Sequence, residues 1–439
     1  MDADPYLPGH GDVTWGATSY QLELDYRMSS NRLAASARIT ARAHTDLRTV
    51  TLDLAAPLRV SKVLVDGRKP RKYAHRANRL VLTLAKRVDE GAAFTIEIGY
   101  GGNPGPLRGT WGEVGWEELS NGVIVAGQPN GAPTWFPCND RPADKAPYRF
   151  EVTADSPYTV RANGVLRGRR IRGSRTTWTF EQAEPMATYL ATLQLGSYET
   201  IRLPSPGSAV AQWALLPPRL RTAFDVDFGR QDAMMVLFER RFGRYPFAEY
   251  TVVVTEDPLE IPLEAQGLAV FGADFVSGRR REERLVAHEL AHQWFGNSLT
   301  VAGWGHIWLN EGFACYAEWL WWEACGDRTA EASARQHYRR LSGLAQDYAI
   351  ADPGPDLMFD DRTYKRGALT LHALRVHLGD KAFFELLRSW VSEHAHGVVT
   401  TADFVAHAQR HAARSGRPSV RVLLRRWLYD AALPSYPRA

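Results

Sequence analysis

The chain has 439 residues, of which 45% are apolar and 23% are charged, as is typical of a folded globular protein. This composition excludes the disordered, collagen-like and coiled-coil classes. The length favours two or three domains. A net charge of +4 is too small to indicate a nucleic-acid or membrane partner.

The first 200 residues have the period of two that marks half-buried strands. Apolar and polar residues alternate at 20–26 and again at 94–98. Asn163-Gly164 lies between two such runs and predicts a tight hairpin. A break rich in proline and glycine begins at Pro204, so we place a domain boundary near residue 200. Residues 1–200 are therefore predicted to form an N-terminal antiparallel β domain.

Beyond residue 200 the period of the apolar residues becomes helical. The sequence predicts a second, mainly helical domain over residues 201–439, and hence an α+β multidomain protein. The predicted elements are a short strand at 251–255 and helices at about 281–295, 311–325, 367–378, 382–394 and 420–429.

The cysteines and the first residues of the chain indicate in which cellular compartment the protein is expected. Cys138, Cys315 and Cys325 form neither a CxxC pair nor an even framework, so a disulfide scaffold or a thiolate zinc site is not expected. No secretion signal and no membrane span is visible, although removal of a signal would leave the same sequence. We expect a cytoplasmic protein and favour a monomer.

The pattern HExxH occurs once, from His288 to His292. Two histidines four residues apart lie on one face of a helix, so both imidazoles can reach one metal ion. Glu289 follows the first histidine and is placed to act as a general base on the water of that metal. The alternative is a pair of core histidines whose ring nitrogens form hydrogen bonds with other groups of the same chain.

A third ligand favours the metal site over that alternative, because catalytic zinc takes three protein ligands and leaves one position open. Phe295 and Ser298 occupy the glycine and histidine places of the pattern HExxHxxGxxH, which excludes the three-histidine class. Glu311, at the start of the next predicted helix, supplies a carboxylate instead. Glu318 lies two turns later on the same face, and we expect it to accept a hydrogen bond from a ligand histidine. A surface carboxylate is the alternative for Glu318.

Two stretches, 288–297 and 308–314, are closely similar to the signature of zinc aminopeptidases of the aminopeptidase N and leukotriene-hydrolase type, which are gluzincins. Residues 136–145 resemble a motif in the β domain of that family. The resemblance implies a thermolysin-like catalytic domain with one Zn²⁺ per chain. Larger relatives carry a further helical domain. The residues that follow Tyr364 are too few for one, so we expect no large C-terminal helical domain.

Three further site residues follow from the resemblance. Tyr364 matches the tyrosine that stabilises the oxyanion in the family, unless it is a buried core tyrosine. Glu264 matches the glutamate that holds the α-ammonium group of the substrate. Gln128 matches the glutamine that shares this role, unless its amide only bonds backbone. The motif around Glu264 departs from the family, since Ile261 and Pro262 replace its glycine and alanine, and Pro262 has no N–H to donate.

The resemblance implies that the enzyme removes the N-terminal residue from peptides with a free amino terminus, through a zinc-activated water. Alternatives are an endopeptidase or another zinc hydrolase, such as an epoxide hydrolase, on the same site. A non-catalytic peptide-binding relative is a further alternative, against which His288, Glu289, His292, Glu311 and Tyr364 argue together.

Overall fold

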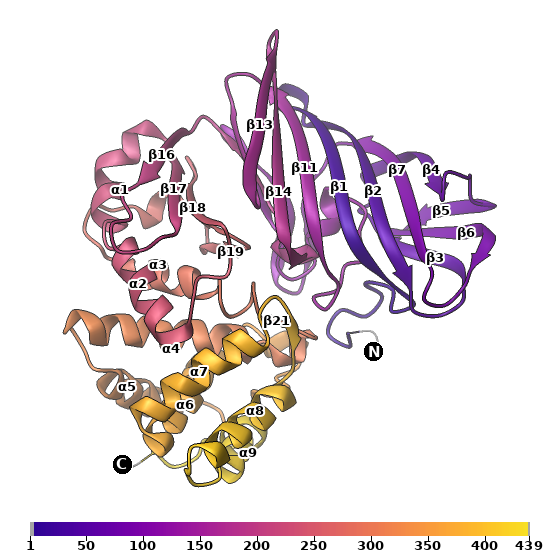
Figure 1. Ribbon diagram of the computed structural model, residues 1–439. Helices are drawn as coiled ribbons and strands as arrows, with labels where there is room; N and C mark the ends of the chain where they lie inside the picture. The colour runs from indigo at the N-terminus through magenta and orange to yellow at the C-terminus, as the bar shows by residue number, and fades with distance from the viewer. Residues whose placement is uncertain (1–3, 438–439) are drawn as a thin grey trace. The chain divides into compact units, whose positions relative to one another are not determined.

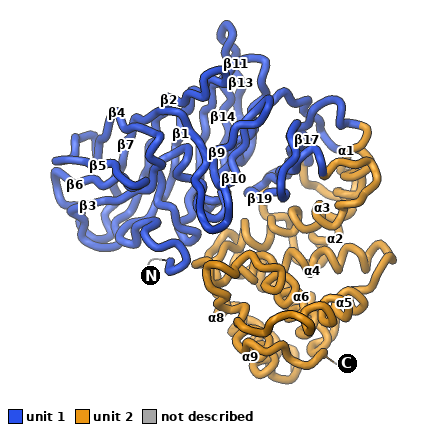
Figure 2. Tube along the Cα trace, turned by 180° about the vertical axis from the view of Figure 1, so that it is seen from behind, with its two compact units in different colours: residues 1–203, 212–221, 248–274 blue, residues 204–211, 222–247, 275–439 orange. Residues whose placement is uncertain are grey.

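The structure, a computed structural model, describes residues 4–437 and divides into two compact units (Figures 1 and 2). Unit 1 comprises Met1–Leu203, Gln212–Arg221 and Ala248–Asp274, and unit 2 comprises Pro204–Ala211, Thr222–Phe247 and Phe275–Ala439. Within residues 4–437, no helix combines the length and the apolar composition needed to cross a membrane.

Unit 1 is built on a seven-stranded sheet with the order β13-β14-β11-β1-β2-β7-β4 (Figure 1). The alternation predicted for 20–26 lies in β1, where the buried Tyr20, Leu22 and Leu24 alternate with exposed Gln21 and Glu23. The strands are β1 (Trp15–Arg27), β2 (Arg32–Ala43), β4 (Leu58–Val65), β7 (Ala93–Gly102), β11 (Lys145–Asp155), β13 (Val165–Arg172) and β14 (Arg175–Ala187).

The prediction of a purely antiparallel β domain is wrong at one strand pair. β1 and β11 are parallel, with Tyr20 opposite Tyr148. Parallel neighbours need a long connection, and more than 100 residues of chain separate these two strands. The two tyrosine rings stack at 4.7 Å between centroids, so the pairing also contributes to the core.

The predicted hairpin at Asn163-Gly164 is also wrong. β12 (Thr159–Ala162) pairs with β15 (Leu193–Gly196), whereas β13 pairs with β14, so the turn connects two different sheets. Asn163 is buried, and its side-chain amide donates to the carbonyl oxygens of Leu190 and Gln266. Tertiary hydrogen bonds of this kind cannot be read from a local turn signal.

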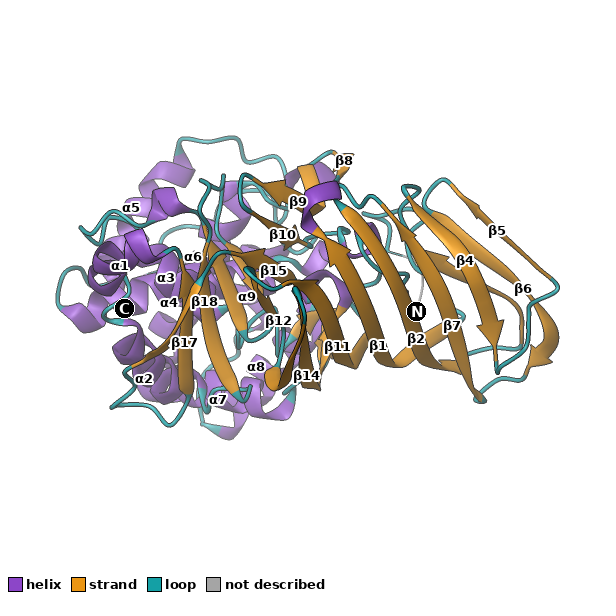
Figure 3. Cartoon of the chain, turned by 90° about the horizontal axis from the view of Figure 1, so that it is seen from above, coloured by secondary structure: helices purple, strands orange, loops and turns teal. Residues whose placement is uncertain are grey.

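Three smaller sheets complete the β structure of unit 1 (Figure 3). Their orders are β12-β15-β10-β9-β8, β3-β6-β5 and β16-β17-β18-β20-β19. The additional strands are β3 (Leu47–Asp53), β5 (Lys72–Arg76), β6 (Arg79–Val88), β8 (Leu107–Gly109), β9 (Gly112–Leu119), β10 (Gly122–Ala126), β16 (Glu199–Leu203), β17 (Ala211–Leu216), β18 (Glu249–Val254), β19 (Leu263–Ala265) and β20 (Leu268–Phe271).

The two units do not follow a single boundary at residue 200. The chain returns to unit 1 twice beyond that point, at 212–221 and 248–274. The physical reason is the last sheet, in which β17 pairs with β16 while β18, β20 and β19 lie side by side. Strands far apart in sequence are therefore held in one unit by their backbone hydrogen bonds.

Unit 2 contains nearly all the helical residues, together with the short parallel pair of β21 (Thr300–Val301) and β22 (Val398–Val399). The core lies around α4, whose residues from Trp308 to Trp321 are all buried. The helices are α1 (Arg221–Asp227), α2 (Gln231–Phe242), α3 (Glu283–Ala291), α4 (Trp308–Cys325), α5 (Ala330–Ser342), α6 (Asp361–Leu378), α7 (Asp380–Glu393), α8 (Thr401–Arg414) and α9 (Arg421–Tyr429).

Candidate metal centre

Helix α3 presents the two histidines of the HExxH pattern on one face. His288 lies in its last turns, and His292 is the capping residue whose N–H bonds to the His288 carbonyl at 3.2 Å. The ring centroids lie 4.8 Å apart. The chain then turns at Gly296, where φ is +117° and an added Cβ would lie 3.3 Å from Nδ1 of His292. A side chain at this position would therefore be strained and would crowd the imidazole of His292.

Helices α4 and α6 cross at two glycines that face each other. A Cβ added to Gly312 would lie 2.8 Å from Cα of Gly367, so only glycine permits this approach. Gly312 follows Glu311 directly, and Gly367 lies about one turn after Tyr364. The close crossing therefore brings the ring of Tyr364 into a parallel arrangement with His288, at 6.3 Å between centroids.

Three atoms converge as zinc ligands must. Oε2 of Glu311 lies 3.4 Å from Nε2 of His288 and 3.5 Å from Nε2 of His292. Tetrahedral zinc with nitrogen and oxygen ligands at 2.0–2.2 Å separates those ligands by roughly 3.3–3.5 Å. All three residues are buried and their ligand atoms already have this spacing, so zinc binding needs little rearrangement of the side chains. The residues fit one zinc ion with an open fourth position.

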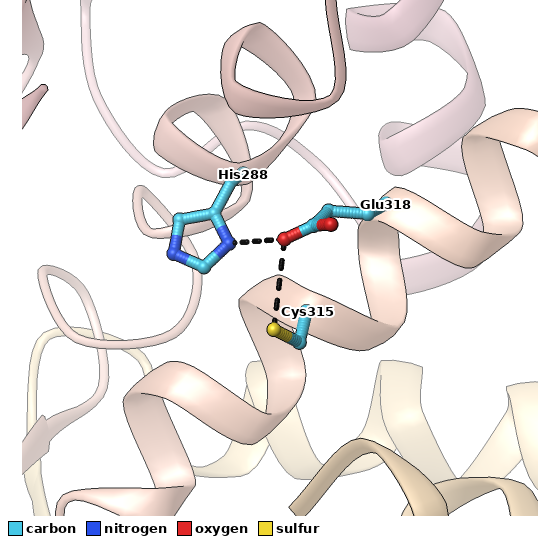
Figure 4. A group of neighbouring side chains, drawn as sticks. All are labelled: His288, Cys315 and Glu318. Atoms are coloured by element: carbon cyan, nitrogen blue, oxygen red, sulfur yellow. Dashed lines mark hydrogen bonds and ion pairs between the residues drawn. The ribbon is translucent and has the colours of Figure 1, made fainter. Parts of the chain in front are cut away.

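The outer ring nitrogens are already engaged. Nδ1 of His288 lies 2.8 Å from Oε1 of Glu318 (Figure 4). Nδ1 of His292 lies 3.0 Å from the Phe295 carbonyl oxygen. A carboxylate and a carbonyl accept, so both Nδ1 atoms donate and the lone pairs of Nε2 point to the metal position. The structure thus brings Glu318 to the position expected of a partner of a ligand histidine.

Buried charge shapes the pKa values of these groups. Burial opposes ionisation of Glu311, but His292 and His288 outweigh it and hold its pKa at about 2. Burial equally opposes a charged imidazole at His288, but hydrogen bonds with Cys315, Glu311 and Glu318 raise its pKa well above the usual value. A metal ion therefore competes with a proton at this histidine.

Sequence reasoning missed Cys315, which contacts Glu318, and Lys365, which contacts Cys315. Nζ of Lys365 donates to Sγ of Cys315 at 3.0 Å. Cys315 in turn donates to Oε1 of Glu318 at 3.5 Å (Figure 4). Burial opposes the ionisation of Glu318, but Lys365 and His288 lower its pKa to about 2. Cys315 lies three residues before Glu318, and this helical spacing is the one signal that could have linked Cys315 to Glu318.

Glu289 and Tyr364 both lie near the two histidines. Glu289 is buried, and its Oε2 has no hydrogen-bond partner within residues 4–437. Burial raises the pKa of Glu289, although the neighbouring His288 and His292 oppose the shift. An unsatisfied buried carboxylate oxygen beside a metal position is suited to take a proton. Tyr364 is half-buried rather than fully enclosed in the core.

Gln128 and Glu264 lie together in unit 1. Nε2 of Gln128 donates to Oε1 of Glu264 at 2.6 Å, and both side chains are half-buried. Glu264 is held on β19, which pairs with β20. The structure therefore joins these two predicted residues within unit 1, and the six predicted residues from His288 to Tyr364 within unit 2.

Removing the Glu318 carboxylate, which accepts the hydrogen bond from Nδ1 of His288, tests whether this bond supports zinc binding. We expect Glu318→Ala to weaken zinc binding roughly 10–100-fold, because His288 loses the bond that fixes its ring and tautomer. Competition with a calibrated chelator measures the affinity. Glu385→Ala, another carboxylate of unit 2, is the control. Equal zinc affinity in wild type and Glu318→Ala would make Glu318 a residue without influence on the metal.

The sequence matches the Peptidase family M1 domain over residues 227–427 and the Peptidase M1 N-terminal domain over residues 17–190. The chain belongs to peptidase family M1. The predicted family resemblance is thereby confirmed, and the β unit and helical unit correspond to the two-domain fold of M1 peptidases.

This M1 chain resembles the crystal structure of the M1 zinc metallopeptidase from Deinococcus radiodurans, with 29% identity, a TM-score of 0.89 and 99% of each chain covered. A mutant of that protein bound to a Tyr-Ser-Ala substrate matches with the same values. Aminopeptidase M1 of Arabidopsis thaliana is 26% identical over 386 residues, which is 81% of this chain. The chain spans 42% of the length of that relative.

Proposed function

We propose that this chain is a zinc-dependent aminopeptidase that hydrolyses the N-terminal residue from peptides. The observation that carries the proposal is the convergence of His288, His292 and Glu311 on one position, with Glu289 beside it. The donor set is the one that zinc hydrolases use, two imidazoles and a carboxylate with a nearby base. The names of the relatives, aminopeptidase and zinc metallopeptidase, support the same assignment.

The side chains of unit 2 divide the chemical work. Zinc, when bound, supplies a Lewis acid that polarises the scissile carbonyl and lowers the pKa of a water molecule. Oε2 of Glu289 takes the proton of the attacking water and later delivers it to the departing amine. The hydroxyl of Tyr364 donates a hydrogen bond to the carbonyl oxygen as negative charge develops there. His288 and His292 stay fixed through their Nδ1 atoms.

The Gln128–Glu264 pair of unit 1 binds the free ammonium group of the substrate. The Glu264 carboxylate and the side-chain carbonyl of Gln128 are acceptors, and their mutual hydrogen bond orients both groups. An ammonium group has only donors, so it matches this pair and a blocked amine does not. This requirement restricts cleavage to the first peptide bond and makes the β unit part of substrate recognition.

Substrates with free and acetylated amino termini test this restriction. Wild type should cleave the free-amine peptide and leave the acetylated one. Glu264→Ala should lower kcat/KM for the free-amine peptide about 10–100-fold, because one charge-assisted hydrogen bond is lost. The loss should appear mainly in KM, as measured by product release at varied peptide concentration.

Glu260→Ala removes an exposed carboxylate four residues earlier and is the matched control. If wild type cuts both peptides equally well, the chain is an endopeptidase and the role of Glu264 is refuted.

Three finer properties belong to the same proposal. The metal-binding helix followed by a helix with the third ligand supports a thermolysin-like arrangement of unit 2. The three cysteines are free thiols, which suits a reducing, cytoplasmic compartment. We favour a monomer that acts on peptides.

A further inference from the structure

A second group of potential metal ligands lies where α7 ends and α8 packs against it. Glu393 is the last residue of α7, His394 follows it, and His407 lies on α8. One ligand atom of each residue lies within 4.8 Å of the other two. None of these residues belongs to the set around Glu311, so the group is a separate feature of unit 2.

Both imidazoles of this group pack against one indole. The ring centroid of Trp390 lies 4.2 Å from that of His394 and 5.4 Å from that of His407. Thr400 and Asp403 form a capping box that fixes the start of α8. The two rings are therefore held in place by helix packing and capping.

Two ring nitrogens of the group have unused hydrogen-bonding capacity. Nε2 of His394 and Nδ1 of His407 are buried and have no hydrogen-bond partner in the part of the chain that the structure describes. Both nitrogens belong to residues of one cluster with the Glu393 carboxylate, so a single bound group can engage both of them. A metal ion that accepts both lone pairs satisfies them together.

The contacts of His407 determine which of its nitrogens carries the proton. Oγ of Ser389 lies 3.0 Å from the Leu386 carbonyl oxygen and 2.8 Å from Nε2 of His407. A carbonyl only accepts, so the hydroxyl hydrogen is directed to Leu386, and Nε2–H donates to Ser389. Nδ1 is then a bare lone pair, and it faces Oε2 of Glu393 at 3.3 Å.

The lone pair of Nδ1 and the Glu393 carboxylate, 3.3 Å apart, are both acceptors and repel each other unless a cation lies between them. Zinc with ligands at 2.0–2.2 Å separates those ligands by roughly 3.3–3.5 Å, which the Nδ1–Oε2 pair already matches. The geometry of this pair suits a metal ion.

We propose that Glu393, His394 and His407 bind a second divalent transition-metal ion, with Zn²⁺ as the best-suited occupant. Two imidazoles and a carboxylate are ligands that Zn²⁺ prefers. The side chain of Glu393 is 48% exposed, so the ion enters from solvent. The bound ion joins α7 to α8 across the segment that holds β22, and it stabilises this part of unit 2.

The test counts metal ions on the full chain, with Zn²⁺ alone as the probe. Wild type, equilibrated with Zn²⁺ and freed of excess, should hold one more zinc ion per chain than Glu393→Ala/His394→Ala. The variant should keep wild-type peptidase activity, since neither residue belongs to the catalytic set. Zn²⁺ should also raise the melting temperature of wild type more than that of the variant. His44→Ala, an exposed histidine of unit 1, should retain the wild-type zinc content.

The difference in zinc content does not depend on the proposed peptidase activity. If the site around Glu311 bound no zinc, wild type would hold one ion and the double variant none. The single variant Glu393→Gln, which changes only a half-exposed side chain, confirms that any loss is not due to misfolding. Equal zinc content in wild type, Glu393→Gln and the double variant would overturn the proposal.

Discussion

Glu289→Gln should retain zinc but lower kcat by roughly 10²–10⁴-fold, the usual contribution of a general base. The amide keeps the size of the side chain and cannot take a proton. Glu289 is suited to the role because burial raises its pKa towards neutral pH and its Oε2 has no partner within the described chain. Hydrolysis of an aminoacyl reporter gives kcat, and elemental analysis gives the zinc content.

Glu282→Gln, at the start of the same helix, is the matched control and should behave as wild type. Near-normal turnover in zinc-loaded Glu289→Gln would assign the base to another residue. Loss of zinc together with activity would instead make Glu289 a residue that maintains the metal site.

Tyr364→Phe should lower kcat about 10²-fold and leave KM nearly unchanged. The substitution keeps the ring beside His288 and removes only the hydroxyl. A hydrogen bond that strengthens as charge develops on oxygen contributes to the transition state and little to substrate binding. Steady-state kinetics on a free-amine peptide separate the two constants.

Tyr338→Phe removes the hydroxyl of a tyrosine on α5 that bonds the Pro434 carbonyl, and it controls for a general effect of such a change. A higher KM with unchanged kcat in Tyr364→Phe would make Tyr364 a residue that packs against substrate.

The candidate metal centre was largely accessible from the sequence because its geometry is local. Two histidines four residues apart share a helix face wherever the helix forms, and Glu311 lies in the first turn of α4, a helix that the apolar period predicts. The position of Tyr364 was different. It depends on the contact between Gly312 and Gly367, which no pattern within one helix reveals.

The parts that sequence reasoning missed depend on long-range pairing. β12 pairs with β15 and β13 pairs with β14, so neither strand pairs with the one that follows or precedes it across the turn. The buried side-chain amide of Asn163 donates hydrogen bonds to residues 27 and 103 positions away. The strands of the last sheet of unit 1 are separated by helices of unit 2, so no single boundary could describe them. Helices α1, α2, α5 and α8 were not predicted either, although α8 carries the capping box of Thr400 and Asp403.

Cleavage of aminoacyl amides before and after removal of zinc tests the central claim most directly. The protein as purified should release free amino acids, lose that activity on treatment with a chelator, and recover it when stoichiometric Zn²⁺ is restored. His288, His292 and Glu311 are the only source of this dependence in the proposed mechanism. Hydrolysis that persists at the original rate in protein shown to be free of zinc would contradict the account.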